Sequence, residues 1–327
     1  MRSLAPLLAA AAFIATPPAF AAPAPGQPAA AEAAAPVQPQ AARLGPLITA
    51  PQLAAAGAGP LILDIRGEAY GQGHIPGALD APYKLFRGPA DNPGALVPVE
   101  RLQATLSGLG LSKDRPVVIV HQGSDQDDFG SAARVYWTLK SAGIQDIAIL
   151  NGGMNAWAAA GLPADTAPVA PQPTQLAITW DDRWTASEDE VARIAAGQED
   201  ARLLDARPAE FFQGSKAHAA ASAPGTVPGA QSVPHTEWFA GQTPSVAPPA
   251  TAADIAARLG IRPGGEVVTF CNTGHWAATE WFALSELAGL PNVRMYPESM
   301  VGYTKGDHQI ANKPGLVDNL MRQIKGL

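Results

Sequence analysis

Cysteine is nearly absent from this chain: Cys271 is the single one among 327 residues. One thiol cannot form an internal disulfide, so the apolar core must hold the fold together. The sequence has no basic cluster and a formal net charge of −7, which gives no reason to expect nucleic acid or an anionic membrane as a partner. Beyond the N-terminus no apolar run is long enough to span a bilayer, so we expect a soluble mature protein.

The N-terminal part differs in composition from the rest. A positive start at Arg2 precedes an apolar run over 4–14 and the small-x-small sequence Ala19-Phe20-Ala21, the order of a secretory signal peptide. Residues 22–42 are almost entirely Ala, Pro, Gln and Gly, which cannot bury a core. We expect a signal peptide over 1–21, a linker over 22–42 and a periplasmic protein; an Ala-rich tail without a signal is the alternative.

The remaining sequence contains one series of segments twice. The paired segments, in chain order, are 61–66 and 202–207, 73–78 and 225–230, 116–121 and 266–271, 130–142 and 276–288, and 147–150 and 293–296. Their order is conserved and their offset is nearly constant, which predicts a duplicated domain rather than a solenoid. We expect one domain over 43–165 and a second over 175–327, joined by the Pro-rich stretch 163–173.

Each half alternates short β-branched runs with segments of helical period. The helical candidates include 98–109, 187–196 and 251–259, with Ser187 and Thr251 as expected N-caps. Continuous apolar strands between helices predict an α/β fold, in which each half is a mostly parallel sheet with helices on both faces. Ligands of such sheets bind outside the carboxyl ends of the strands.

Cys271 falls at such a strand end. The apolar run 267–270 stops there, a polar turn follows, and a helical pattern begins at Trp276. Loop N–H groups and the positive end of the helix dipole would stabilise a thiolate over a thiol, and Gly274 would supply a positive φ. We expect a reactive thiol at the mouth of a pocket, because an unpaired cysteine in an exported chain favours a functional role. The alternative is a small core residue.

Three motifs in this order resemble rhodanese-type sulfurtransferases. They are the Leu-Asp-x-Arg strand end, the Gly-x-Ile/Val-Pro-Gly-Ala turn and the segment Asn151–Trp157. The duplicated layout is similar to the tandem-domain thiosulfate or 3-mercaptopyruvate sulfurtransferases, and the cysteine loop most resembles an exported bacterial subgroup. The resemblance covers about residues 45–305 and implies two tandem rhodanese-like domains. It also implies that the second half is catalytic and the first is not, since His121 stands in place of Cys271.

The resemblance also implies a set of site residues. Cys271 would carry the persulfide, and Arg207 would bind the anionic substrate. The rest of the substrate-binding loop would be Asn272, Thr273, Gly274, His275 and Trp276. An Arg207–Asp205 pair that braces the sheet edge is the alternative for Arg207, because Arg66 and Asp64 repeat the pattern.

The implied activity is the transfer of a sulfane sulfur from a small anionic donor, such as thiosulfate, to a thiophilic acceptor. A nonenzymatic persulfide carrier that serves an exported protein partner is the alternative. A cysteine phosphatase would need Cys-x5-Arg, and Ala277 occupies the arginine position. The loop has no basic residue besides His275, which leaves the donor open. Lys216 and His218, in an insertion of the second half, either reach the pocket or form a surface loop.

We expect neither a metal nor a cofactor. His121 is followed by Asp125, Asp127 and Asp128, but Phe129 occupies an EF-hand ligand position and no Glu ends the loop. A solvated loop is the expectation.

Overall fold

The computed structural model describes residues 43–241 and 243–315, so the expected signal peptide and linker lie outside the described residues. The strands are β1 (Leu47–Ile48), β2 (Leu61–Asp64), β3 (Leu79–Asp80), β4 (Val117–Val120), β5 (Ile147–Leu150), β6 (Arg202–Asp205), β7 (Gln231–Ser232), β8 (Val267–Phe270) and β9 (Val293–Met295). The α-helices are α1 (Ala50–Ala56), α2 (Val99–Gly108), α3 (Gln126–Ser141), α4 (Gly153–Ala159), α5 (Glu188–Ala195), α6 (Ala209–Phe212), α7 (Pro249–Arg258), α8 (Trp276–Phe282) and α9 (Ser299–Tyr303). Shorter helical turns are η1 (Gly67–Gln72), η2 (Tyr83–Phe86), η3 (Asp182–Trp184) and η4 (His235–Trp238), and η5 (Ala283–Leu287) is a π-helix that continues α8. No helix in the described ranges is long and apolar enough to cross a bilayer.

The strands form two sheets, one in each half of the chain. Their orders are β1-β5-β4-β2-β3 and β7-β6-β8-β9, and all neighbouring strands within them are parallel. Parallel neighbours need crossover connections, which the helices between them supply. The predicted α/β fold, with two parallel sheets and helices on both faces, is confirmed.

Successive side chains of the buried strands point into different hydrophobic cores. In β4, Val118 and Val120 pack outward in a cluster with α1 and α4. Val117 and Ile119 point the other way, into a cluster that also contains residues of the second half. The second sheet repeats this arrangement, since its outer face packs with α5 and α9. Because side chains alternate along a strand, each sheet has one private core and contributes to one shared core.

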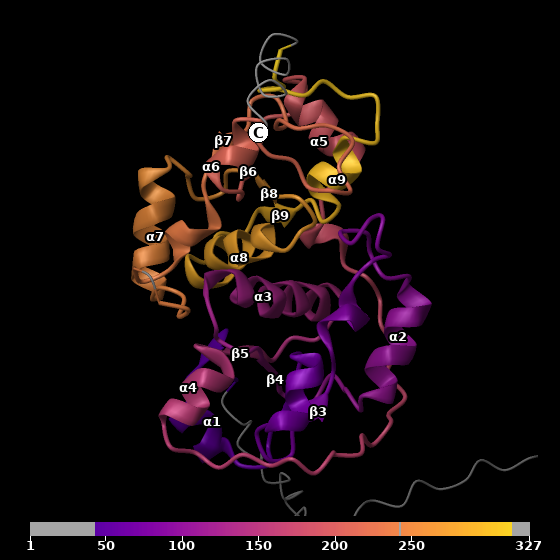
Figure 1. Cartoon of the computed structure of the whole chain (residues 1–327), viewed down its shortest axis with the longest axis vertical. Helices are drawn as coiled ribbons and strands as arrows, with labels where there is room; N and C mark the ends of the chain where they lie inside the picture. The colour runs from indigo at the N-terminus through magenta and orange to yellow at the C-terminus, as the bar shows by residue number, and fades with distance from the viewer. Residues whose placement is uncertain (1–42, 242, 316–327) are drawn as a thin grey trace, which may run out of the picture. The chain divides into compact units, whose positions relative to one another are not determined.

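Helices α3 and α8 lie side by side between the two sheets (Figure 1). Every residue of α3 from Phe129 to Leu139 is buried, as expected for a helix enclosed within a protein. Phe282 of α8 meets Phe129 and Tyr136 of α3 edge to face, with ring centroids 5.6 and 5.0 Å apart. The aromatic contacts make the surface between the halves part of the hydrophobic core.

The connection between the halves, 166–181, contains neither helix nor strand. Its backbone is tied to the first half, because the N–H of Thr174 donates to Ser107 O at 2.9 Å and that of Asp181 to Ser141 O at 2.7 Å.

Of the two expected N-caps, one is confirmed and one is wrong. The Ser187 hydroxyl accepts the N–H of Glu190 at 3.2 Å at the start of α5. Thr251 does not cap α7, because that helix already begins at Pro249. Proline is well suited to a first helical position, since its φ is fixed and its missing N–H needs no acceptor there.

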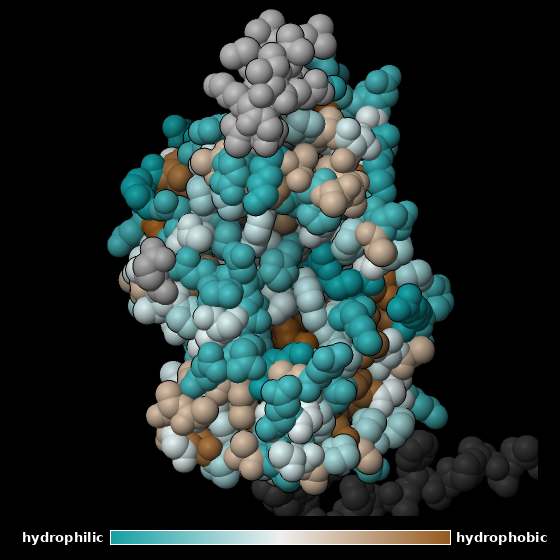
Figure 2. Space-filling view, viewed as in Figure 1, coloured by the Kyte–Doolittle hydropathy of each residue, from teal (hydrophilic) through white to brown (hydrophobic). Residues whose placement is uncertain are grey.

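On the face shown in Figure 2, hydrophobic residues are scattered among hydrophilic ones. Among the described residues, the large apolar side chains that remain exposed are Leu96 and Val99, at 36% and 37%.

Candidate active site

Cys271 follows β8 directly, at the carboxyl edge of the second sheet. Because side chains alternate along a strand, it continues the face of β8 that carries Val267, and both residues belong to the shared core. The predicted position at a strand end is thus confirmed. The thiol is not open to solvent as expected for the mouth of a pocket, because Cys271 is 1% exposed. The physical reason is that side chains of the first half lie against its loop.

The loop after Cys271 curves tightly around Gly274. This glycine has φ +67°, as expected from the sequence. A Cβ at this position would collide with the Arg134 guanidinium and the carbonyl oxygen of Pro297. The position therefore requires glycine for both backbone conformation and space.

Ser299, at the start of α9, holds the loop from inside. Its hydroxyl accepts the N–H groups of Cys271 and Gly274 at 3.0 and 3.1 Å, and it donates to Tyr296 O at 2.9 Å. The oxygen lies 4.0 Å from the Cys271 Sγ. Ser299 has φ +53°, a left-handed conformation that costs a non-glycine residue about 1–2 kcal/mol. Its three hydrogen bonds offset that cost.

Two arginines of the first half hold the loop from outside. Arg87 Nη2 donates to Thr273 O at 2.9 Å, and Arg134 Nη1 donates to Gly274 O at 3.2 Å. Since C=O and N–H point in opposite directions across a trans peptide, the first bond directs the Gly274 N–H toward Ser299. Burial, and then the charge of Arg87, lowers the pKa of Arg134 to about 9, which leaves it protonated at neutral pH.

His275 links the loop to the first half through both ring nitrogens. Its Nε2 lies 2.7 Å from Asp127 O, which can only accept, so Nε2 carries the proton. Its Nδ1 therefore accepts the Tyr83 hydroxyl at 3.0 Å. Burial, and then the nearby Arg87 charge, lowers the pKa of His275 to about 4. The imidazole is thus neutral near pH 7.

Trp276 and His235 stack on one another, with ring centroids 5.0 Å apart and planes 6° from parallel. Both reach Oδ1 of Asp127: the Trp276 Nε1 donates at 3.1 Å and the His235 Nε2 lies at 2.6 Å. Burial lowers the pKa of His235, although Asp127 opposes this shift. The contacts of His275 and Trp276 thus connect the halves, and substrate binding by these two residues stays a prediction.

Arg207 is 2% exposed and hydrogen-bonded on every side. It donates to both carboxylate oxygens of Asp205, at 2.8 and 2.6 Å, to Asn272 Oδ1 at 3.3 Å and to Gly225 O at 2.8 Å. Arg66 makes the same set of contacts in the first half, to Asp64, Gln122 and Gly73. An arrangement repeated beside a loop without a cysteine favours the bracing alternative, and substrate binding by Arg207 stays a prediction.

The corresponding loop of the first half holds a carboxylate. Asp128 Oδ2 accepts the N–H groups of Gly123 and Ser124, at 2.5 and 3.3 Å, and lies 2.9 Å from His121 Nδ1. Burial alone would raise the pKa of Asp128, but the hydrogen bonds from His121 and from the two N–H groups outweigh it and lower this pKa. This loop geometry therefore stabilises a negative charge.

The two loops correspond residue by residue, because 121–125 and 271–275 both lie between a central strand and the helix after it. Cys271 occupies the place of His121, and Ala278 the place of Asp128. The second loop consequently has no carboxylate of its own. Among the described residues, the N–H groups of Asn272, Thr273, His275 and Trp276 have no hydrogen-bond acceptor, and no side chain caps α8.

Glu280 is a buried acid on α8, 0% exposed, and neither carboxyl oxygen has a hydrogen-bond partner among the described residues. Burial, followed by the negative charges of Asp205 and Cys271, raises its pKa well above the usual value. The indole of Trp238 acts in the opposite direction without reaching hydrogen-bond geometry. The enclosed and unpartnered carboxyl group of Glu280 therefore favours the uncharged form over the carboxylate beneath the cysteine loop.

Lys216 and His218, the two residues of the second-half insertion named as candidates for the pocket, differ in their burial. Lys216 is exposed, with its Nζ 4.8 Å from the Phe211 ring centroid. His218 is half-buried, and burial followed by the Arg87 charge lowers its pKa, so it lies within the field of Arg87. In 43–241 and 243–315, no three His, Cys, Asp or Glu side chains are grouped to hold a metal ion.

Sequence reasoning missed Ser299 and the four first-half residues Tyr83, Arg87, Asp127 and Arg134 as neighbours of the cysteine loop. A signal for Ser299 exists in the repeat, since it stands where the first half has Gly153, at φ +60°. Arg134 could have been noticed as one charge within an otherwise apolar stretch of α3. No local motif marks Tyr83, Arg87 or Asp127.

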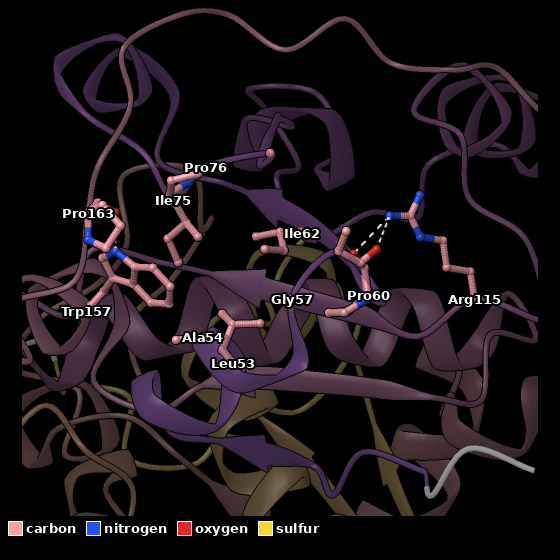
Figure 3. A pocket seen from close by; sticks show the side chains of 12 residues that line it. Leu53, Ala54, Gly57, Pro60, Ile62, Ile75, Pro76, Arg115, Trp157 and Pro163 are labelled. Atoms are coloured by element: carbon pink, nitrogen blue, oxygen red, sulfur yellow. Dashed lines mark hydrogen bonds between the residues drawn. The ribbon is translucent and has the colours of Figure 1, made fainter.

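A separate hollow of about 360 Å³ lies in the first half (Figure 3). Trp157 and Arg115 lie at its two ends, with Ile62 and Ile75 between them. Pro60 and Arg115 precede β2 and β4, so this hollow is at the amino edge of the sheet, opposite the strand ends that correspond to Cys271. It contains none of the predicted site residues.

Known proteins resemble this chain over both halves. A "Thiosulfate sulfurtransferase" of Azotobacter vinelandii is 33% identical over 258 residues, which cover 77% of this chain and 88% of the relative. A "Probable 3-mercaptopyruvate sulfurtransferase" of Pseudomonas aeruginosa is 31% identical over 276 residues, covering 77% and 93%.

Solved structures agree on the fold. The crystal structure of an anaerobic ergothioneine biosynthesis enzyme from Chlorobium limicola superposes with a TM-score of 0.71 at 21% identity, covering 81% of this chain and 70% of that one. The profile of the "Rhodanese-like domain" matches two segments, residues 49–160 and 187–305. The chain therefore belongs to the rhodanese-like domain family, of which it contains two copies in tandem.

Proposed function

We propose that this protein is a sulfurtransferase that carries sulfur as a persulfide on Cys271. The donor would be thiosulfate or 3-mercaptopyruvate, the compounds named in its relatives, and the acceptor a thiophilic small molecule or protein. We also propose that it acts in the periplasm, as the exported subgroup would, on the basis of the signal-like sequence at 1–21.

One observation carries this proposal: the equivalent loop of the first half holds a carboxylate oxygen on two successive N–H groups and His121. The second loop has the same length, lacks that carboxylate and has Cys271 in place of His121. A thiolate and a persulfide are the anions that this loop could itself generate. Four of its N–H groups have no acceptor in the described residues, so they are available to such an anion.

The first step would be attack of the Cys271 thiolate on the sulfane sulfur of the donor. With thiosulfate, a bond forms between Sγ and the outer sulfur, and the old S–S bond breaks with its electron pair leaving on sulfite. With 3-mercaptopyruvate, the C–S bond breaks, its electron pair stays on carbon, and the thiol proton ends on the methyl group of pyruvate. The enzyme product is Cys–S–S⁻ in both cases.

The second step would return the enzyme to its starting state. The acceptor attacks the outer sulfur, and the persulfide S–S bond breaks with its electron pair on Sγ. Cyanide would leave as thiocyanate, and the thiolate would be restored without any oxidant or reductant.

The test is intact-mass analysis of the wild-type protein and of Cys271→Ser after incubation with each donor. We expect one added sulfur on the wild type, its removal by cyanide, and no addition on the variant. Addition to both proteins would refute the role of Cys271. Sulfur addition without sustained thiocyanate formation would instead identify a persulfide carrier.

A further inference from the structure

We propose that Arg87 of the first half, supported by Arg134, recognises the anionic group of the sulfur donor at the Cys271 loop. The ligand would be a sulfane-sulfur donor with a compact anion, either the sulfonate of thiosulfate or the carboxylate of 3-mercaptopyruvate. This inference rests on the proposed function and assigns donor recognition to the half that has no cysteine.

The first support is that neither guanidinium group is paired with a carboxylate at close range, although the Glu298 carboxylate acts on the charge of Arg134. Neither takes part in an ion pair within the described part of the chain. Each also has an enclosed N–H group without an acceptor there, Nη1 of Arg87 and Nε of Arg134. Buried donors without acceptors are costly, so a ligand that accepts from them would be favoured.

The second support is the mutual position of the charges. The charge of Arg87 lowers the pKa of Arg134 and of His275, which shows that two cations and a neutral ring share one small region. A Cys271 thiolate and the Glu298 carboxylate act on Arg134 with the opposite sign. An anionic donor would reduce the repulsion between the arginines while its sulfane sulfur approaches that thiolate.

The third support is accessibility. Arg134 and Cys271 are each 1% exposed, whereas Arg87 is half-buried. His218, also half-buried, lies within the field of Arg87. Arg87 is therefore more exposed than Arg134 and Cys271, although its Nη1 atom is itself enclosed.

The fourth support is that no other residue named for this loop offers a free cation. The Arg207 guanidinium already donates hydrogen bonds to Asp205, Asn272 and Gly225. The His275 imidazole is neutral. Arg87 uses Nη2 to hold Thr273 O and keeps Nη1 for another partner. The planar fork of a guanidinium matches a carboxylate or sulfonate with two parallel N–H groups.

The test compares Arg87→Gln and Arg87→Lys with a matched control, Arg262→Gln, in the full chain. Arg262 is an exposed arginine before β8, at the opposite edge of the sheet, and its replacement removes the same charge. Thiocyanate formation is measured with varied thiosulfate at fixed cyanide, and pyruvate formation with varied 3-mercaptopyruvate.

We expect Arg87→Gln to raise the half-saturating thiosulfate concentration by about tenfold or more, while the maximal rate changes much less. Arg87→Lys should lie between this variant and the wild type, because it keeps the charge and loses the fork. The control should equal the wild type. A rise with thiosulfate alone assigns Arg87 to sulfonate donors, and a rise with both donors assigns it to small anions in general.

An unchanged half-saturating concentration in both Arg87 variants would overturn the inference, as would a fall in maximal rate alone. Failure of the proposed function would be seen in a different measurement, the intact mass, because the wild type would then gain no sulfur from either donor. If Arg87→Gln does not fold, Arg87→Lys decides by the same criterion.

Discussion

Acidification should weaken the structure through His275, and this effect can be isolated by one substitution. The folded protein holds the imidazole neutral between Tyr83 and Asp127, because burial and Arg87 lower its pKa from 6.5 to about 4. Protonation would place a donor where Nδ1 now accepts from Tyr83. It would also add a cation beside Arg87.

The sign follows from proton binding in the two states. Between pH 6.5 and about 4 the unfolded chain binds a proton at His275 that the folded protein excludes. The contribution of the neutral His275 to the free energy of unfolding is therefore fully present above pH 6.5. It is lost as the pH falls through this window. Each pKa unit corresponds to about 1.36 kcal/mol, so the shift is worth at most about 3 kcal/mol.

The assay is urea unfolding of the wild type and of His275→Gln at several pH values from 7 to 4. Glutamine can still donate and accept but does not titrate. We expect the wild type to lose up to about 3 kcal/mol more than the variant across this range. Parallel stability profiles for the two proteins would refute this account of His275.

Four further substitutions test the loop and its surroundings. Gly274→Ala should cost more than the about 1–2 kcal/mol of a left-handed alanine, since its Cβ also collides with neighbours, and urea unfolding measures this. Ser299→Ala should cost about 1–3 kcal/mol by the same assay and slow persulfide formation, because two loop N–H groups lose their acceptor. Arg207→Ala should cost about 3–5 kcal/mol by leaving a buried carboxylate unpaired, with donor affinity measured alongside. The wild type should lose stability as the pH rises from 4.5 toward the raised pKa of Glu280, because the folded protein holds the proton more tightly than the unfolded chain. Glu280→Gln should abolish this loss, which is measured as the free energy of unfolding against pH.

Matched controls separate these effects from general ones. Gly264→Ala, at φ +83° with open space around it, should show only the backbone cost, so an equal loss at both glycines would contradict the collision. Ser141→Ala removes a buried hydroxyl without a partner and should be nearly neutral; a loss as large as at Ser299 would argue against the loop bonds. Arg66→Ala should match Arg207→Ala in stability. A stable Arg207→Ala with weak donor affinity would restore the substrate-binding role.

The fold could be predicted because its signals are local and occur twice. The apolar runs ending at Val120 and Phe270 identify buried parallel strands, and their repetition indicates the duplication. The Thr251 cap failed because a proline pair just before it starts the helix earlier. A threonine that favours an N-cap and a proline that favours the first helical position lie within a few residues there, and the helix begins at the proline.

The candidate site was predictable only where one stretch of chain determines it. Cys271 and the positive φ of Gly274 follow from a strand that breaks into a helix. Arg87 and Arg134 could not be placed, because they lie 186 and 140 residues away in the sequence from the loop residues that they contact. Their position depends on how α3 packs on α8, which side-chain shape decides and sequence period does not show.

The shared core also determines what a severed chain would do. A fragment ending before the second sheet, or beginning there, would present the aromatic flank of α3 or α8 to water, where Phe129, Tyr136 and Phe282 now meet. Such a fragment should self-associate, since a large contiguous hydrophobic surface exposed to water drives aggregation. Each half would therefore need polar side chains on this flank of its central helix before it could exist alone.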